Sequence, residues 1–136
     1  MLTPIVSAPK PPEATRKRIL IAEDDPAIAT MLLRVLGRHY EVEHFATGKA
    51  ALARASAPPP PNLMMLDVMM PELDGFSVAT GVRGIPHLKQ VPIIFLTART
   101  APTDIIKGIQ NGARHYIQKP FKIDEVLAKV KKTIGE

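Results

Sequence analysis

Five side chains with the chemistry of a metal and phosphate site occur at four points of the chain. Glu23 and Asp24 are adjacent, and Asp67, Thr97 and Lys119 follow at long intervals. Three carboxylates in one pocket repel one another and need a cation, and Mg²⁺ takes one or two carboxylates together with waters and phosphate oxygens. A hydroxyl and an ammonium group beside that cation suit a phosphate group. These residue types therefore predict magnesium-dependent phosphate chemistry, provided that the fold brings the four points together.

The sequence has no loop of the kind that cradles a nucleotide phosphate. Neither G-x-x-x-x-G-K nor G-x-G-x-x-G occurs, so a phosphate is expected on a side chain rather than in a nucleotide site. The natural acceptor is the carboxylate of Asp67, because an aspartate can form an acyl phosphate.

Strand and helix signals alternate along the chain and place these residues. Short apolar runs predict five strands, at 19–22, 40–45, 63–66, 91–96 and 115–118. Helical spacing predicts helices at 26–36, 47–55, 76–83 and 104–110, and a last helix with Ile123, Val126, Leu127, Val130 and Ile134 on one face. Asp25, which precedes Pro26, is expected to be a helix N-cap rather than a metal ligand, and Asp74-Gly75 the turn before the third helix.

Five strands that alternate with helices indicate an α/β fold. Parallel pairing through right-handed crossovers gives a doubly wound open sheet with helices on both faces. Ligands of such sheets bind beyond the carboxyl ends of the strands. Glu23, Asp24, Asp67, Thr97 and Lys119 all stand at predicted strand ends, so they are expected to converge at one edge.

The composition excludes several other classes of protein. The chain has 136 residues, which fits one domain, and it has no cysteine, which excludes disulfides and thiolate metal sites. The four histidines lack metal-type spacing and are expected at the surface or at a sheet edge. The six aromatic residues include no tryptophan, so a stacking surface for nucleic acid and direct nucleic-acid binding are not expected, whereas the net charge of +5 permits an acidic partner.

The expected domain organisation is a flexible Pro-rich tail at 1–15 followed by one folded domain at 16–136. No apolar run approaches the roughly 18 residues that span a bilayer, and the first residues lack the basic start of a signal peptide. We therefore expect a cytoplasmic protein without a membrane partner.

The sequence closely resembles the receiver domain of two-component response regulators. The resemblance covers about Lys17 to Gly135. It is carried, in order, by Ile19–Pro26, Leu66–Pro71 with Asp74–Phe76, Pro92–Ala98, Gly112–Tyr116 and Lys119–Phe121. It implies a flavodoxin-like sheet of five parallel strands in the order 2-1-3-4-5. It also implies a phosphoprotein of signal transduction, here of the chemotaxis-type single-domain kind, rather than an enzyme.

The resemblance also implies a role for each candidate at the metal. Asp67 is the phosphoacceptor, which receives its phosphoryl group from a sensor histidine kinase or a phosphotransfer protein of a phosphorelay. The metal ligands for Mg²⁺ are Asp24, Asp67 and the backbone carbonyl of Met69, while Glu23 binds through a water. Receivers more often carry Asp than Glu at position 23, so this chain departs from the family there.

By the same resemblance, Thr97 and Lys119 bind the phosphoryl oxygens, and the Lys119–Pro120 peptide bond is cis. Tyr116 is the aromatic switch residue that responds to Thr97. The downstream protein partner then docks on the last helix-strand-helix face, at about 103–134.

Three other functions compete with this one. A receiver can serve as a phosphorylation-independent interaction module, or the chain can be a fragment of a longer regulator with an output domain. An aspartyl phosphatase would need a second Asp at position 69, where Met69 stands. Regulators that dimerise through their last helices have acidic residues where Arg114-His115 stand, so such a dimer is not expected.

Overall fold

The computed structural model describes residues 16–98 and 115–135. Within them, strands β1 (Arg18–Ala22), β2 (Glu41–Phe45), β3 (Leu63–Asp67), β4 (Ile93–Ala98) and β5 (His115–Lys119) form one parallel sheet. The strand order is β2-β1-β3-β4-β5. This confirms the predicted α/β fold, its parallel pairing and its strand order. The helix predicted at 104–110 and the tail at 1–15 lie outside the described residues.

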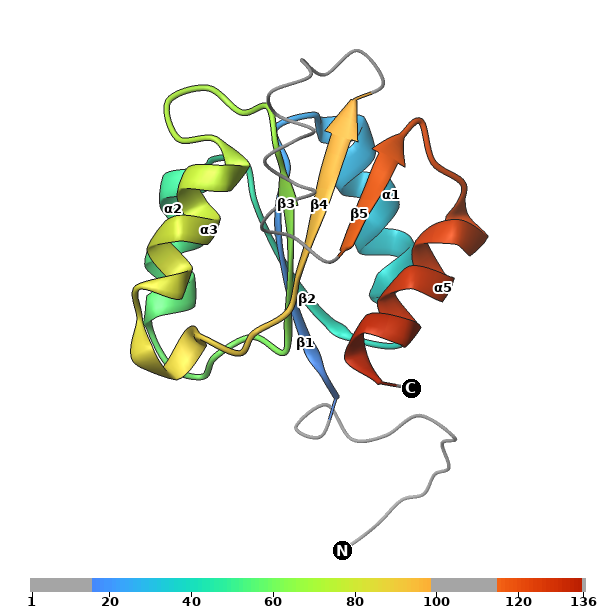
Figure 1. The fold of residues 1–136 in the computed structure, drawn as a ribbon. Coiled ribbons are helices and arrows are strands. Elements are labelled where there is room, and N and C mark those ends of the chain that lie inside the picture. The colour runs from blue at the N-terminus through green and yellow to red at the C-terminus, as the bar shows by residue number, and fades with distance from the viewer. Residues whose placement is uncertain (1–15, 99–114, 136) are drawn as a thin grey trace, which may run out of the picture.

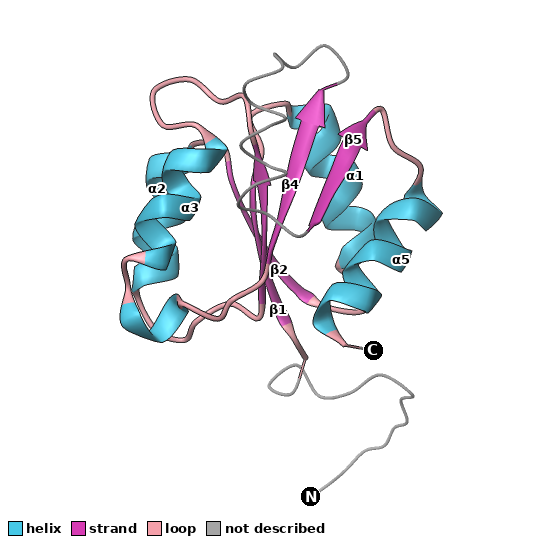
Figure 2. Cartoon of the chain, viewed as in Figure 1, coloured by secondary structure: helices cyan, strands magenta, loops and turns pink. Residues whose placement is uncertain are grey.

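Helices cover both faces of the sheet. Helices α2 (Gly48–Ser56) and α3 (Gly75–Arg83) lie on one face, and α1 (Pro26–Leu36) and α5 (Ile123–Ile134) lie on the other (Figures 1 and 2). A short 3₁₀ turn, η2 (Pro86–Leu88), precedes β4. No helix among the described residues is long and apolar enough to cross a membrane.

The core consists of two layers that the central strands separate. Side chains alternate across a strand, so β1 and β3 contribute to both layers, and each of their residues from Ile19 to Ala22 and from Leu63 to Asp67 is buried. Leu20, Met64 and Phe95 pack in the layer on the α2 and α3 side. Ile21, Met65 and Leu96 pack in the layer on the α1 and α5 side. This explains why the central strands are continuous apolar runs.

Helix caps set the helix starts near the site. The Asp25 carboxylate accepts hydrogen bonds from the N–H groups of Ala27 (2.9 Å) and Ile28 (3.4 Å), which confirms it as the N-cap of α1. The Thr47 hydroxyl accepts from Ala50 N–H at 3.1 Å, so α2 starts at Gly48, one residue later than predicted.

Strand β4 begins and ends two residues later than the apolar run predicts. Val91 N–H donates to the Leu88 carbonyl in the preceding turn, and Pro92 has no N–H to join the ladder. Pairing with β5 continues through Thr97 opposite Gln118 and Ala98 opposite Lys119. Thr97 therefore lies within the strand rather than after it.

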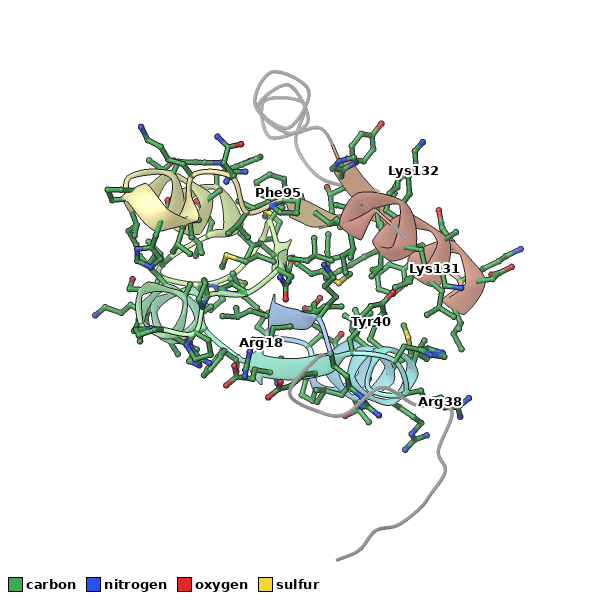
Figure 3. All side chains as sticks on the ribbon, turned by 90° about the horizontal axis from the view of Figure 1, so that it is seen from below. Arg18, Arg38, Tyr40, Phe95, Lys131 and Lys132 are labelled. Atoms are coloured by element: carbon green, nitrogen blue, oxygen red, sulfur yellow. The ribbon has the colours of Figure 1, made fainter. Side chains whose placement is uncertain are left out.

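The edge of the sheet at the amino ends of the strands is rich in basic side chains. Figure 3 looks onto this edge, where Arg18 comes from β1, Arg38 follows α1, and Lys131 and Lys132 come from α5. The last turn of each of the four described α-helices carries a basic residue. Positive charge there complements the negative helix C-terminus, so the fold itself accounts for part of this basic edge.

Gly75 is required by a close approach between α3 and β3. A Cβ atom at Gly75 would lie 2.5 Å from the backbone oxygen of Asp67. The neighbouring Asp74 carboxylate accepts from Ser77 N–H at 2.8 Å. Asp74 is therefore the N-cap of α3, and Gly75, predicted in the turn before this helix, is its first residue, so α3 starts one residue earlier than predicted and close to the end of β3.

Gly75→Ala is expected to destabilise the protein by about 1–3 kcal/mol, because the backbone of β3 or α3 must shift to admit the methyl group. Gly84→Ala is the matched control: its Cβ would lie 3.4 Å from the nearest carbonyl oxygen, and it is expected to change stability by less than about 0.5 kcal/mol. Urea denaturation of both variants checks this, and equal effects would contradict it.

Candidate functional site

The strand ends bring the predicted residues together at one edge of the sheet. Glu23 and Asp24 follow β1, while Asp67 is the last residue of β3 and Lys119 the last residue of β5. One carboxylate oxygen from each of Glu23, Asp24 and Asp67 lies within 4.8 Å of the others. The predicted convergence of these groups is confirmed, and parallel pairing is its cause.

Lys119 reaches into the centre of this acidic cluster. Its Nζ atom lies 2.9 Å from Oε1 of Glu23 and 3.3 Å from Oδ2 of Asp67. The peptide bond between Lys119 and Pro120 is cis, as the family pattern implies. Three carboxylates against one ammonium leave an excess of negative charge in the cluster.

Burial differs sharply within the cluster. Glu23 and Asp67 are 0% and 3% exposed, whereas Asp24 is open to solvent. Withdrawing a carboxylate from water disfavours its charged form, and a second carboxylate nearby disfavours it further. The cluster is thus accessible at Asp24 and closed around the other two carboxylates.

The electrostatics of Asp67 follow from this burial. Burial raises the pKa of Asp67, the hydrogen-bonding neighbours Glu23 and Asp24 and the charge of Glu23 raise it further, and Lys119 opposes them, which leaves the pKa at about 8. For Lys119, burial lowers the pKa, but Glu23 and Asp67 outweigh it, so the pKa lies above its ordinary value. The Lys119 ammonium therefore remains charged, but this single positive charge does not balance the carboxylates of the cluster.

A hard divalent cation fits this set of groups. Carboxylate oxygens are the ligands that Mg²⁺ prefers, the cluster has negative charge in excess of Lys119, and the exposed Asp24 gives access from solvent. The residues present therefore suit the metal that the residue types predicted.

Met69 and Thr97 lie beside the cluster. Met69 N–H donates to Oδ1 of Asp67 at 3.1 Å, which places its peptide group next to that carboxylate, while its side chain is half exposed. Thr97 is buried, and its hydroxyl donates to the Ala98 carbonyl at 3.4 Å. Because Asp67 pairs with Leu96, Thr97 stands one position beyond the residue opposite Asp67.

Tyr116 lies apart from the carboxylates. It pairs with Phe95 in the register of β4 and β5, three positions before Lys119, and its side chain is 48% exposed. The structure thus brings the carboxylates and Lys119 together, whereas Tyr116 lies earlier in the edge strand β5 with its side chain half exposed.

His44 is a site residue that sequence reasoning missed. It lies on the edge strand β2, as expected, but its Nε2 atom is 2.7 Å from the Glu23 carbonyl oxygen. The N–H of Glu23 donates to the Phe45 carbonyl at 3.1 Å. The end of β2 therefore holds the backbone of Glu23, and the only sequence signal was the position of His44 near the end of a strand.

Asp67→Asn is expected to stabilise the metal-free protein, increasingly as the pH rises. The folded-state pKa of Asp67 is about 8, against about 4 for an unfolded aspartate. The folded protein thus holds a proton that the unfolded chain has lost, so wild-type stability falls as the pH rises from about 4 to about 8. One pKa unit corresponds to about 1.4 kcal/mol, and relaxation of the site limits the gain at pH 8 to about 2–4 kcal/mol.

Urea denaturation with a chelator at pH 5 and pH 8 measures this gain. Asp74→Asn is the control, because Asn caps a helix as well as Asp does, and it should keep the wild-type pH dependence. A gain from Asp67→Asn that is the same at both pH values would contradict the prediction.

Comparison with known proteins agrees with this site. Residues 19–131 match the response regulator receiver domain family. The DNA-binding response regulator MtrA of Mycolicibacterium smegmatis is 38% identical over 120 residues, which are 88% of this chain and 51% of MtrA. RpaA of Synechocystis, described as a DNA-binding dual master transcriptional regulator, is 38% identical over 117 residues, covering 84% of this chain and 47% of RpaA. The chain spans about half the length of these relatives.

Solved receiver structures are similar over nearly their whole length. The Vibrio cholerae chemotaxis protein CheY4 is 31% identical with a TM-score of 0.78, covering 88% of this chain and 99% of that one. The receiver domain of the Pseudomonas aeruginosa sensor histidine kinase PA1611 is 32% identical with a TM-score of 0.76, covering 90% and 100%. That structure has a magnesium ion coordinated in its active site cleft.

The relatives do not single out one branch of the family. DNA-binding regulators and a chemotaxis protein both match, so the narrower chemotaxis-type expectation is not established. The match over 19–131 nevertheless spans most of the chain, and the acidic cluster is typical of receivers. The chain belongs to the response regulator receiver domain family, the non-enzymatic signalling modules of two-component systems.

Proposed function

We propose that the protein is a cytoplasmic, phosphorylation-dependent switch whose phosphoacceptor is Asp67. The observation that carries this proposal is the cluster of Glu23, Asp24 and Asp67, with Lys119 in ion-pair contact with the acceptor. The phosphodonor is a sensor histidine kinase or a phosphotransfer protein, since histidine kinases are the partners of the family.

Asp24 and Asp67 would supply carboxylate ligands for Mg²⁺, and Met69 would supply its backbone carbonyl. Glu23, whose carboxylate oxygens contact Lys119 and Asp25 N–H, would contribute through a water molecule. When bound, the ion offsets the negative charge that gathers on the phosphoryl oxygens.

The proposed step is a transfer between two side chains. A carboxylate oxygen of Asp67 attacks the phosphorus atom while the bond from phosphorus to the donor histidine nitrogen breaks, and the electron pair stays on the imidazole. The product is an acyl phosphate on Asp67. Lys119 and the Thr97 hydroxyl bind the phosphoryl oxygens. Burial and the neighbouring carboxylates hold the pKa of Asp67 at about 8, and the charge of Lys119 favours, against them, the ionised form that the attack needs.

The output of the switch is a shift between two packings of β4 and β5. Thr97 moves toward the phosphoryl group, and the Tyr116 ring, now half exposed, fills the space that Thr97 leaves. A near-complete shift needs a preference of about 10⁴-fold for the phosphorylated packing. The partner surface is the face at about 103–134, of which 115–134 is described.

There are two alternatives to a stand-alone switch: a receiver that controls an output domain, and an interaction module that works without phosphorylation. The curated relatives are DNA-binding proteins about twice the matched length, which favours a receiver that controls an output domain. A phosphorylation-independent interaction module would not need the contact of Lys119 with Asp67, so it is the weaker alternative.

Incubation with a small phosphodonor such as acetyl phosphate and Mg²⁺ is expected to add one phosphoryl group to the wild-type protein. Asp67→Asn should abolish the gain, which intact-mass measurement detects. Asp74→Asn, at an exposed N-cap carboxylate, should keep it. No gain in the wild type, or an equal gain in Asp67→Asn, would refute the proposal.

Tyr116 is expected to become protected when a phosphoryl analogue, beryllium fluoride with Mg²⁺, binds. Nitration of Tyr116, followed by peptide mass mapping, should fall about fivefold or more as the buried packing becomes dominant. Tyr40, already 3% exposed, is the internal reference. Thr97→Ala should remove the protection, and protection that persists in this variant would show that Thr97 does not drive the movement.

A further inference from the structure

The described carboxylates are concentrated at one edge of the molecule. They follow β1, end β3, lie in the loop between β3 and α3, or begin α5, all at the carboxyl ends of the strands, except for Glu41 and Glu43 on β2. These two are already paired, because Glu41 lies 3.1 Å from Arg18 and Glu43 lies 2.9 Å from Arg54. Within the described residues, the edge at the amino ends of the strands therefore has no carboxylate left to neutralise its other cations.

Six exposed basic side chains at this edge are unpaired. None of them forms an ion pair or a hydrogen bond with another described residue. They come from the chain before β1, the end of α1, the turn before β4 and the end of α5, and they are Lys17, Arg34, Arg38, Lys89, Lys131 and Lys132. We call these six residues the amino-edge cluster, and Figure 3 labels three of them, Arg38, Lys131 and Lys132.

The fold holds the elements of the amino-edge cluster next to one another. Helices α1 and α5 lie on the same face of the sheet (Figure 1), and Leu36 at the end of α1 packs in the same core layer as Val130 and Ile134 of α5. Lys17 and Lys89 line one hollow together with Ile134. Like charges gathered in this way repel one another, so the cluster costs stability as long as nothing binds it.

The helix dipoles explain only part of this charge. The C-terminus of a helix carries the equivalent of about half a negative elementary charge. Helices α1 and α5 together thus call for about one positive charge, but two cations stand at or just after the end of each. Lys17 precedes a strand and Lys89 follows a single 3₁₀ turn, so neither complements an α-helix. The remaining positive charge is available to an anionic partner.

The same edge also presents backbone hydrogen-bond acceptors. A helix leaves its last carbonyls without partners inside the helix. At the end of α1, later N–H groups donate to the carbonyls of Leu33 and Leu36, whereas no described backbone N–H donates to those of Arg34 and Val35. A partner that fits this edge brings anions for the cations and N–H donors for the carbonyls. An acidic polypeptide brings both, whereas the phosphate groups of DNA or of a lipid surface offer acceptors only.

We infer that the amino-edge cluster is a docking surface for an acidic segment of a partner protein. It lies at the opposite end of the sheet from the carboxylates of Glu23, Asp24 and Asp67, so docking does not depend on phosphorylation. It shares Lys131 and Lys132 with the proposed partner face and extends from there to β1 and α1. A partner anchored in this way stays bound both before and after the phosphoryl switch.

Fluorescence anisotropy with a labelled peptide in which Glu alternates with Ser tests this inference on the whole chain. The protein should bind this peptide at least about tenfold more tightly than the same peptide with Gln in place of Glu. Arg38→Glu combined with Lys131→Glu should weaken binding about tenfold or more, because attraction to carboxylates becomes repulsion.

The matched control is Lys49→Glu combined with Lys122→Glu. It makes the same change in net charge at two exposed lysines near the helix starts, and it should weaken binding less than about threefold. An equal loss in both double variants would show that the peptide responds to net charge alone, which would overturn the inference.

A second pair from the cluster keeps the test decisive if the first pair does not fold, as judged by circular dichroism. Lys17→Glu combined with Lys89→Glu changes two other elements, and it should also weaken binding about tenfold. The inference is wrong if neither pair weakens binding more than the control pair does.

The class of partner is tested with duplex DNA and with vesicles of phosphatidylglycerol and phosphatidylcholine. At equal concentrations of negative charge, the acidic peptide should bind more tightly than either. N-methylation of the peptide backbone, which removes the N–H donors, should weaken its binding about threefold or more. Tighter binding of DNA or vesicles, or an N-methylated peptide that binds as well, would rule out an acidic polypeptide as the partner.

Independence from phosphorylation is tested by adding beryllium fluoride with Mg²⁺. The peptide affinity should change less than about twofold, since two sites that do not share a conformational change have no coupling free energy. A larger change would refute docking that is independent of the switch. If the protein takes up no phosphoryl group but binds the peptide through the cluster, the proposed function fails and the docking surface stands.

Discussion

Repulsion between carboxylates that the fold forces together is the constraint on which the rest of this structure depends. Glu23 and Asp67 are buried within reach of Asp24, and neither burial nor a like neighbour favours a charged carboxylate. The chain tolerates this arrangement because Glu23 follows β1 and Asp67 ends β3. These two strands are the most deeply packed, and their apolar side chains fill the two core layers. Lys119 offsets only part of the negative charge, so the cluster lacks the positive charge that a bound divalent cation would supply.

The parallel sheet explains why this repulsion is concentrated at one edge. Every described strand ends there and every described α-helix starts there, so carboxylates meet helix N-termini, whose dipoles favour negative charge. Asp25 and Asp74 use that preference to cap α1 and α3. At the opposite edge the helices end, and basic residues such as Lys131 and Lys132 complement them. The modest net charge of the chain thus conceals a separation of acidic and basic residues along the strand direction.

Much of the fold and of the candidate site was predictable because it rests on local patterns. The buried strands show as apolar runs, Asp25 before Pro26 shows a helix start, and the acidic cluster follows from strand ends in a parallel sheet. What was missed depends on contacts between distant segments. Three features depend on two elements at once. They are the pairing with β5 that places Thr97 within β4, the close approach of Gly75 to the backbone oxygen of Asp67, and the contact of His44 Nε2 with the Glu23 carbonyl. No periodicity within one segment encodes them.

The sharing of Lys119 between two carboxylates links this constraint to signalling. Nζ lies nearer to Glu23 than to Asp67. In the proposed phosphorylated state, Lys119 can bind a phosphoryl oxygen while Asp25 N–H still donates to the second oxygen of Glu23. A ligand shifts a two-state protein only by the difference in its affinity for the two states. In the proposed switch that difference has to come from contacts with the phosphoryl oxygens, such as that of Lys119, because the charge of a phosphoryl group alone adds to the negative charge already in the cluster.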